Sequence, residues 1–175
     1  IREPKQHGYI GINVTVPHKE AIMEFTRPDE KARAIGAVNT IDFRTNLGTN
    51  TDADGLINDL LANDVVLDGK RVLILGAGGA SKLIANELIK FVNTKLTVAN
   101  RTMKRFETWD LEVNQISLEQ AESHLDEFDI IINTTPAGMD DNQDIPIDLK
   151  YLNPETLVSD IVYIPYKTPI LIAAE

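Results

Sequence analysis

The strongest constraint on the fold is a continuous apolar run that ends in a cluster of glycines. Residues 71–76 read RVLILG, and residues 76–81 read GAGGAS. Apolar residues without alternation are typical of a strand that is buried on both faces of a parallel sheet. Gly76 permits a tight turn after that strand, and Gly78 lets the backbone approach a phosphate closely. The helix that follows would direct its free N–H groups at the anion, so this stretch predicts a dinucleotide site.

The third glycine position of such a fingerprint holds Ser81, which is small enough for close packing of a helix on a strand. A glycine-rich turn without any ligand is the alternative interpretation. The context favours the dinucleotide site, because the turn directly follows a buried strand and opens a helix.

Strands and helices alternate along the rest of the chain. We predict strands within residues 71–76, 95–100, 113–116, 128–139 and 156–163, and helices within residues 79–92, 101–109, 117–125 and 168–175. Thr168 and Pro169 suit the cap and the first position of the last helix. Strands that alternate with helices form a parallel sheet through right-handed crossovers. The predicted fold class is therefore α/β, with a Rossmann-like doubly wound parallel sheet.

A second, smaller α/β segment precedes this sheet. We predict a strand at residues 9–14, helices at residues 19–25 and 28–36, and two strands around a turn at Thr45 and Asn46. Residues 52–63 carry leucine and isoleucine at helical spacing and would link the two parts. The expected domains are residues 1–64, with the linking helix, and residues 65–167, with residues 168–175 starting a C-terminal helix.

A basic cluster follows the second strand of the predicted sheet. About 20 residues after the glycines, a dinucleotide site usually has an acidic residue that holds the ribose 2′-OH. Here residues 95–106 read KLTVANRTMKRF instead, and Asn100, Arg101, Thr102 and Arg105 stand at the strand end and just beyond it. A guanidinium can pair bidentately with a phosphate, so the cluster indicates NADP, which has a 2′-phosphate. A solvated basic helix face is the alternative.

Composition narrows the classes of partner. The 175 residues include 27 acidic and 17 basic side chains, so the formal net charge of −10 argues against a nucleic-acid partner. There is no cysteine and only three scattered histidines, so we expect no metal site. No apolar run is long enough to span a bilayer, and no signal peptide opens the chain, so we expect no membrane partner and a cytoplasmic protein. The sequence leaves open whether the protein is a monomer or a homodimer.

Polar residues that suit proton transfer occur in the first segment. Lys19 ends the stretch NVTVPHK, Asn39 lies in GAVNT, and Asp52 lies in NTDADG. A lysine close to a carboxylate can move a proton beside a hydride transfer. Taken singly, Lys19 is compatible with a solvated surface charge, and Asp52 with a helix N-cap.

Seven motifs in order resemble the shikimate dehydrogenase family, which includes shikimate/quinate enzymes. They are NVTVPHK, GAVNT, NTDADG, GAGGAS, NRTMKR, NTTPAGM and SDIVYIPYKTPIL, and they run over nearly the whole chain. The resemblance implies a two-domain cleft enzyme that uses NADP to reduce 3-dehydroshikimate reversibly to shikimate in aromatic amino acid biosynthesis. Its substrate domain would include residues 1–64, and the helix from residue 168 would return to that domain.

The resemblance also implies roles for individual residues. Lys19 and Asp52 match the catalytic pair, and the substrate-binding residues would be Thr15, Asn39 and Tyr163. The residues that match the cofactor site are Gly76, Ala77, Gly78, Gly79, Ala80, Asn100, Arg101, Thr102 and Arg105, together with Thr134 and Ala137 after the fourth strand.

The chain departs from the family pattern in two respects. Leu83 stands where the family often has a small residue. The family's chains extend further at both ends, where they carry a serine pair and a glutamine that bind the substrate, so we expect a truncated sequence. The alternatives to the NADP enzyme are a quinate/shikimate dehydrogenase that uses NAD and a non-catalytic nucleotide-binding module.

Overall fold

The computed structural model describes residues 4, 6–15, 17–140 and 142–175, which form two compact units, Ile1–Gly55 and Leu56–Glu175. The division between the units falls inside helix α3 (Asp52–Ala62), whose Ile57 and Leu60 are buried. The domain limits predicted at residues 64 and 168 came from the pattern of the sequence, and they stay predictions. Within the described part of the chain, no helix is both long enough and apolar enough to cross a membrane.

The first unit is built on a small mixed sheet with the strand order β1-β3-β4-β2. Strands β1 (Gly11–Asn13), β3 (Thr40–Asp42) and β4 (Leu47–Thr49) are antiparallel, whereas β2 (Arg27–Pro28) runs parallel to β4. In the register, Ile41 pairs with Ile12 on one side and with Gly48 on the other. Strand β2 has two residues and no apolar alternation, so the sequence pattern did not predict it.

Two short helices accompany this sheet. Helix α2 (Glu30–Ile35) starts where the side chain of Asp29 accepts a hydrogen bond from the amide of Ala32 at 2.8 Å. It ends at Gly36, which has a φ of 76° and so adopts the left-handed conformation that stops a helix. The helix predicted at residues 19–25 is a 3₁₀ helix, η1 (Ala21–Phe25). The buried core of this unit consists of Ala32, Val38, Ile41 and Phe43.

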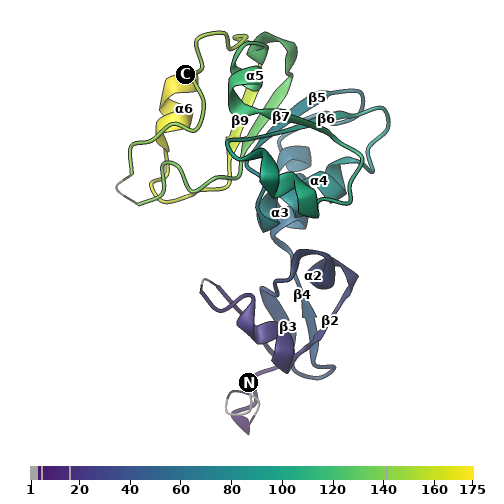
Figure 1. Ribbon diagram of the computed structural model, residues 1–175. Helices are drawn as coiled ribbons and strands as arrows, with labels where there is room; N and C mark the ends of the chain where they lie inside the picture. Colours follow the sequence, from purple (N-terminus) through teal and green to yellow (C-terminus); the bar gives the residue numbers. More distant parts are fainter. Residues whose placement is uncertain (1–3, 5, 16, 141) are drawn as a thin grey trace. The chain divides into compact units, whose positions relative to one another are not determined.

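The second unit (Figure 1) contains a parallel sheet. Its strand order is β7-β6-β5-β8-β9, as predicted for a doubly wound fold. Its strands are β5 (Arg71–Leu75), β6 (Lys95–Asn100), β7 (Asn114–Ser117), β8 (Ile130–Asn133) and β9 (Leu157–Asp160). Strand β5 pairs with β6 on one side and with β8 on the other. The strand order reverses between β5 and β8, and in open α/β sheets ligands bind outside the carboxyl ends of the strands at such a point. This unit is Rossmann-like.

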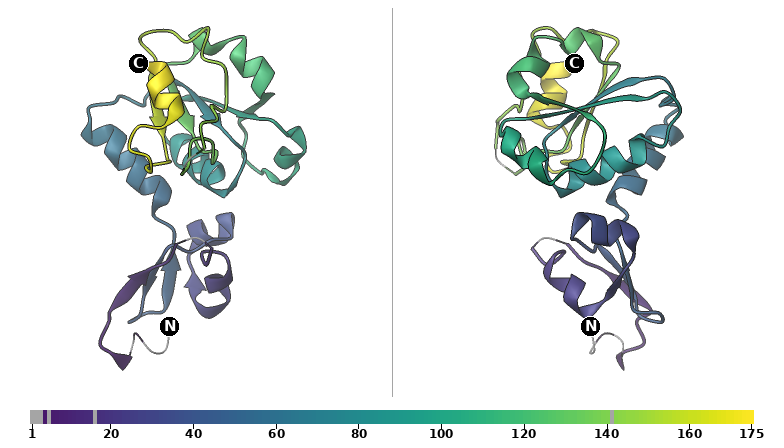
Figure 2. Two further views of the ribbon diagram at one scale, coloured as in Figure 1. Left: turned by 90° about the vertical axis from the view of Figure 1, so that its left-hand side faces the viewer. Right: turned by 45° about the vertical axis from the view of Figure 1, so that its right-hand side comes forward.

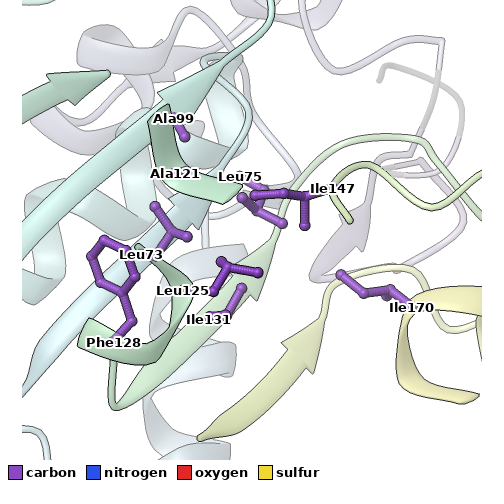
Figure 3. Packing of buried hydrophobic residues seen from close by; sticks show 9 residues of the cluster. All are labelled: Leu73, Leu75, Ala99, Ala121, Leu125, Phe128, Ile131, Ile147 and Ile170. Atoms are coloured by element: carbon purple, nitrogen blue, oxygen red, sulfur yellow. The ribbon is translucent and has the colours of Figure 1, made fainter. Parts of the chain in front are cut away.

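Helices cover both faces of this sheet (Figure 2). Helix α4 (Gly79–Leu88) packs on β5 and β6, while α5 (Leu118–Glu122) and α6 (Pro169–Ala174) lie on the opposite face, and η3 (Leu125–Glu127) follows α5. That opposite face carries a buried apolar cluster (Figure 3), in which Leu73 and Leu75 of β5 meet Leu125, Ile131 and Ile170. The burial of Ile170 holds the first turn of α6 in the second unit.

Several boundaries differ from the predictions. Helix α4 ends at Leu88 instead of residue 92, and the predicted helix 101–109 is a 3₁₀ helix, η2 (Met103–Thr108). Thr168 does precede α6, but its hydroxyl donates to Asp160 Oδ2 at 2.6 Å instead of capping the helix. Tertiary partners outcompete the local ones in this case. Leu83, the departure from the family pattern, is buried on α4.

Candidate functional site

The first unit brings Lys19 and Asp52 together across 33 residues of sequence. The ammonium of Lys19 lies 2.8 Å from Asp52 Oδ2, and the two side chains are 27% and 48% exposed. Lys19 precedes η1 and its carbonyl accepts a hydrogen bond from the amide of Val38, while Asp52 is the first residue of α3. A half-exposed ion pair of this kind contributes little to stability. It leaves a proton donor and a carboxylate accessible next to each other.

Asn39 holds the carboxylate of this pair. Its Nδ2 donates to Asp52 Oδ1 at 2.7 Å and to Thr51 Oγ1 at 3.3 Å. Its Oδ1 accepts hydrogen bonds from the hydroxyl of Thr40 at 2.9 Å and from the amide of Thr51 at 3.1 Å. The side chain is 6% exposed, so both its donors and its acceptor are used inside the protein. Asn39 therefore fixes the orientation of Asp52 toward Lys19.

The other two predicted substrate residues are Thr15 and Tyr163. Thr15 follows strand β1, and its side chain is exposed without a hydrogen bond to any described residue. Tyr163 belongs to the second unit, follows β9 and is 79% exposed. Their predicted roles stay predictions.

A cavity of about 620 Å³ opens in the second unit at the glycine turn. Its walls come from the segments that follow β7, β6, β5 and β8, so it lies at the carboxyl ends of four neighbouring parallel strands. The lining residues are Gly76, Ala77, Gly78, Asn100, Arg101, Thr102, Arg105, Leu118, Thr134, Thr135, Pro136, Ala137, Asn142, Asp144, Ile145 and Pro146.

Gly76 has no room for a side chain. Its φ is 107°, which L-residues rarely adopt, and an added Cβ would lie 2.8 Å from the hydroxyl oxygen of Thr134. The amide of Gly76 donates to the carbonyl of Ala99 at 2.8 Å, which ties the turn to the end of β6. Gly78 has no atom within 4 Å of the place a Cβ would take, and it caps α4. Gly76 is thus required by the backbone conformation and by the lack of space, whereas Gly78 leaves open space beside the start of α4.

A chain of hydroxyls holds the turn against the loop after β8. Thr134 Oγ1 donates to the carbonyl of Leu75 at 2.6 Å and lies 2.6 Å from Ser81 Oγ. Because the hydroxyl of Thr134 donates its only proton to the carbonyl of Leu75, the hydroxyl of Ser81 must donate to Thr134. Ser81 Oγ in turn accepts a hydrogen bond from the amide of Gly78 at 3.2 Å. The serine at the third position of the fingerprint therefore fastens the glycine turn to the cavity wall.

Arg101 and Arg105 line the cavity with free guanidinium groups. Neither side chain has a hydrogen bond or ion pair with any residue that the structure describes, although the chain has a net charge of −10. Asn100 Nδ2 donates to the carbonyl of Thr102 at 2.8 Å and so closes the turn that contains Arg101. Two unpaired cations beside the free N–H groups of a helix start form a site suited to an anion.

Sequence reasoning placed some residues at this cavity that do not line it, and it missed others. Gly79 and Ala80, at the start of α4, are not among the residues that line it. Leu118, Thr135 and Pro136 were missed, and so were Asn142, Asp144, Ile145 and Pro146. Asn142 and Asp144 are exposed, yet they form one wall. Only their position in the chain could have predicted Asn142 and Asp144, because they follow β8, whose carboxyl end lies at the cavity.

Comparison with known proteins gives the family. Residues 60–140 match the family model of shikimate/quinate 5-dehydrogenase, and residues 1–41 match that of the shikimate dehydrogenase substrate-binding domain. Together the two matches span more than half of the chain. The chain belongs to the shikimate dehydrogenase family. The residues matched to the second model lie in the first unit, which carries Lys19.

Curated members of the family are similar over most of this chain. Shikimate dehydrogenase (NADP(+)) from Staphylococcus haemolyticus is 58% identical over 168 residues, which are 94% of this chain and 63% of the relative. The protein of the same name from Staphylococcus aureus strain MSSA476 gives the same identity and coverage. The chain thus spans less than two thirds of the length of these relatives.

Solved structures of the family share the fold. A shikimate dehydrogenase in complex with NADP+ has a TM-score of 0.83 and 34% identity, covering 99% of this chain and 64% of its own. The enzyme from Thermus thermophilus, in complex with NADP(H) and shikimate, has a TM-score of 0.82 and 31% identity, covering 98% and 65%. A quinate dehydrogenase from Corynebacterium glutamicum, in complex with NAD, has a TM-score of 0.81 and 28% identity, covering 99% and 66%.

Proposed function

We propose that the protein with this chain is an NADP-dependent oxidoreductase that reversibly reduces 3-dehydroshikimate to shikimate, a step of aromatic amino acid biosynthesis. The observation that carries the proposal is the contact of 2.8 Å between Lys19 Nζ and Asp52 Oδ2 in the unit that matches the substrate-binding domain. The names of the similar curated proteins support the same reaction. A cytoplasmic location fits this biosynthetic role and is part of the proposal.

Lys19 supplies the proton in the proposed reaction. NADPH, when bound, supplies the hydride that adds to the carbonyl carbon. As charge develops on the carbonyl oxygen, the ammonium of Lys19 donates a proton to it, and the product is an alcohol. Asp52 accepts a hydrogen bond from Lys19 and keeps that side chain at the reacting oxygen. In the reverse direction Lys19 takes the proton from the hydroxyl.

Asn39 acts in this scheme mainly by orienting Asp52. All its polar groups already have protein partners, so a substrate hydroxyl that binds Asn39 directly must replace one of them. We assign Thr15 to a substrate hydroxyl and Tyr163 to the region of the substrate carboxylate, on the family resemblance. Residues 1–64 are the proposed substrate domain with its linking helix, residues 65–167 the nucleotide domain, and residues 168–175 the start of a returning helix.

The cavity of the second unit fits NADP. The missing Cβ of Gly76 and the open space at Gly78 let a pyrophosphate approach the start of α4, where the first amides have no helical partner. The unpaired guanidiniums of Arg101 and Arg105 suit a 2′-phosphate, and no acidic residue stands at the end of β6. This last feature favours NADP over NAD and therefore the shikimate enzyme over an NAD-dependent quinate enzyme.

The test is the oxidation of NADPH in the presence of 3-dehydroshikimate, followed by absorbance, with the intact protein and its Lys19→Ala variant. We expect turnover that depends on Lys19 and is faster with NADPH than with NADH. A protein that binds NADPH without turnover would be a nucleotide-binding module instead. Turnover of quinate with NAD⁺ in preference to shikimate with NADP⁺ would favour the quinate enzyme.

A further inference from the structure

Lys82 connects the two elements that carry the anion-binding groups of the cavity. It lies one turn into α4, which starts at the glycine turn, and its ammonium donates to the carbonyl of Thr108 at 3.3 Å. Thr108 is the last residue of η2, the 3₁₀ helix that contains Arg105. The same ammonium forms an ion pair of 2.9 Å with Asp110 Oδ1. One side chain thus joins the helix that starts at the glycine turn to the 3₁₀ helix that carries Arg105.

The Lys82 side chain is bound to these partners and does not line the cavity. It is 22% exposed, whereas that of Asp110 is 79% exposed. The hydrogen bond from Lys82 holds the pKa of the Asp110 carboxyl below its usual value, so Asp110 stays ionised at neutral pH. Neither residue lines the cavity. The lysine is therefore placed to hold η2 rather than to touch a bound nucleotide.

The aromatic contact of η2 is local to that helix. Phe106 is buried, and its ring meets that of Trp109 edge to face with 5.7 Å between the ring centroids. Trp109 directly follows η2, so this contact does not tie η2 to α4. The hydrogen bond from Lys82 to Thr108 and the ion pair with Asp110 make that connection.

We propose that Lys82 and Asp110 form a clamp that positions Arg105 for the 2′-phosphate of the nucleotide. The inference rests on the proposed NADP site and adds a positioning residue to it. A guanidinium reads a phosphate through directional hydrogen bonds, so a small shift of η2 weakens the contact with the 2′-phosphate. The unphosphorylated nucleotide makes no such contact, and the clamp has little effect on it.

The experiment measures the affinities of NADP⁺ and NAD⁺ by calorimetry for the full chain and its variants. We expect Lys82→Met and Asp110→Asn each to weaken NADP⁺ binding about three- to tenfold, the usual range for one hydrogen bond or ion pair. NAD⁺ binding changes less than about twofold in both, and the double variant is no worse than either single one. Lys82→Arg keeps the cation and its donors, so it retains most of the NADP⁺ affinity.

The two single variants separate positioning from charge. Asp110→Asn removes a negative charge and releases Lys82, so an electrostatic effect alone, or a direct contact of Lys82 with the phosphate, makes NADP⁺ bind more tightly. The clamp requires the opposite sign. Lys90→Met is the matched control, because it breaks an ion pair of 2.6 Å with Glu87 beyond the far end of α4 and also removes one positive charge. It leaves the ratio of the two affinities unchanged.

Each outcome distinguishes the clamp from the NADP site on which it rests. A wild-type chain that binds NADP⁺ no better than NAD⁺ would overturn the proposed cofactor. A wild-type preference for NADP⁺ that survives Lys82→Met, or that grows in Asp110→Asn, would overturn the clamp and leave the cofactor proposal standing. Equal weakening of both nucleotides by Lys82→Met would show a general loss of structure, which also contradicts the clamp.

Discussion

Substitution of Gly76 by alanine tests whether the glycine turn is limited by space. The backbone at Gly76 has a φ of 107°, and a Cβ there would lie 2.8 Å from Thr134 Oγ1 and 3.2 Å from Thr135 Cγ2. The hydroxyl of Thr134 cannot simply move away. It is held at 2.6 Å from the carbonyl of Leu75 and at 2.6 Å from Ser81 Oγ.

The expected loss combines strain with broken hydrogen bonds. A residue with a side chain in such a conformation costs roughly 1–3 kcal/mol. Rotation of Thr134 out of the clash gives up one or two hydrogen bonds, each worth about 1 kcal/mol net. Gly76→Ala should therefore lower the free energy of unfolding of the second unit by about 2–5 kcal/mol, a large share of the roughly 5–15 kcal/mol typical of a domain.

Urea unfolding followed by tryptophan fluorescence measures this loss. Trp109 is the only tryptophan in the sequence and packs on Phe106, so its emission reports on the second unit by itself. Gly78→Ala is the control, because nothing lies within 4 Å of the added Cβ and the φ of −91° suits alanine. It should keep the stability within about 0.5 kcal/mol, the range of substitutions away from packed features, yet weaken NADP⁺ binding. A Gly76→Ala variant that loses less than about 1 kcal/mol would refute the steric argument.

Three further predictions concern charged groups. Arg101→Ala should weaken NADPH binding about 10- to 150-fold and NADH binding far less, measured by titration; equal losses would mean that Arg101 does not bind the 2′-phosphate. Lys19→Ala should lower kcat by roughly 10²–10⁴, and Asp52→Ala added to it should cost little more, whereas single losses that multiply in the double variant would contradict a coupled pair. The Arg44 guanidinium lowers the pKa of Asp42 from 3.8 to about 2, so the pair stabilises the fold above about pH 4 and this contribution is lost as the pH falls from about 4 to about 2. An NMR titration of the Asp42 carboxyl checks this value, and a midpoint near 3.8 would contradict it.

The local patterns of the sequence determined the parallel sheet and its glycine turn. A strand that is buried on both faces is predominantly apolar, and residues 72–75 are all apolar. A turn with a positive φ favours glycine, and Gly76 stands there. The residue types therefore predicted both the strand and the turn. The sequence also predicted the basic cluster at Arg101 and Arg105, because these residues directly follow a predicted strand. The parallel direction of the five strands also follows from their alternation with helices.

Only the tertiary structure decided how separate segments meet. The contact between Lys19 and Asp52, the saturation of Asn39 and the bond between Ser81 and Thr134 all join residues that are distant in sequence. The spacing of residues along one segment does not predict such pairs. A hydrogen bond between distant residues depends on how the fold places their two backbone segments relative to each other.

The wall formed by residues 142–146 and the clamp from Lys82 to Asp110 belong to this second class. Polar and charged residues in a loop have the same composition whether they face solvent or a ligand, so sequence reasoning could not separate the two cases. The edge of the sheet at which the loops after β7, β6, β5 and β8 converge decides which of these side chains lie beside the cavity.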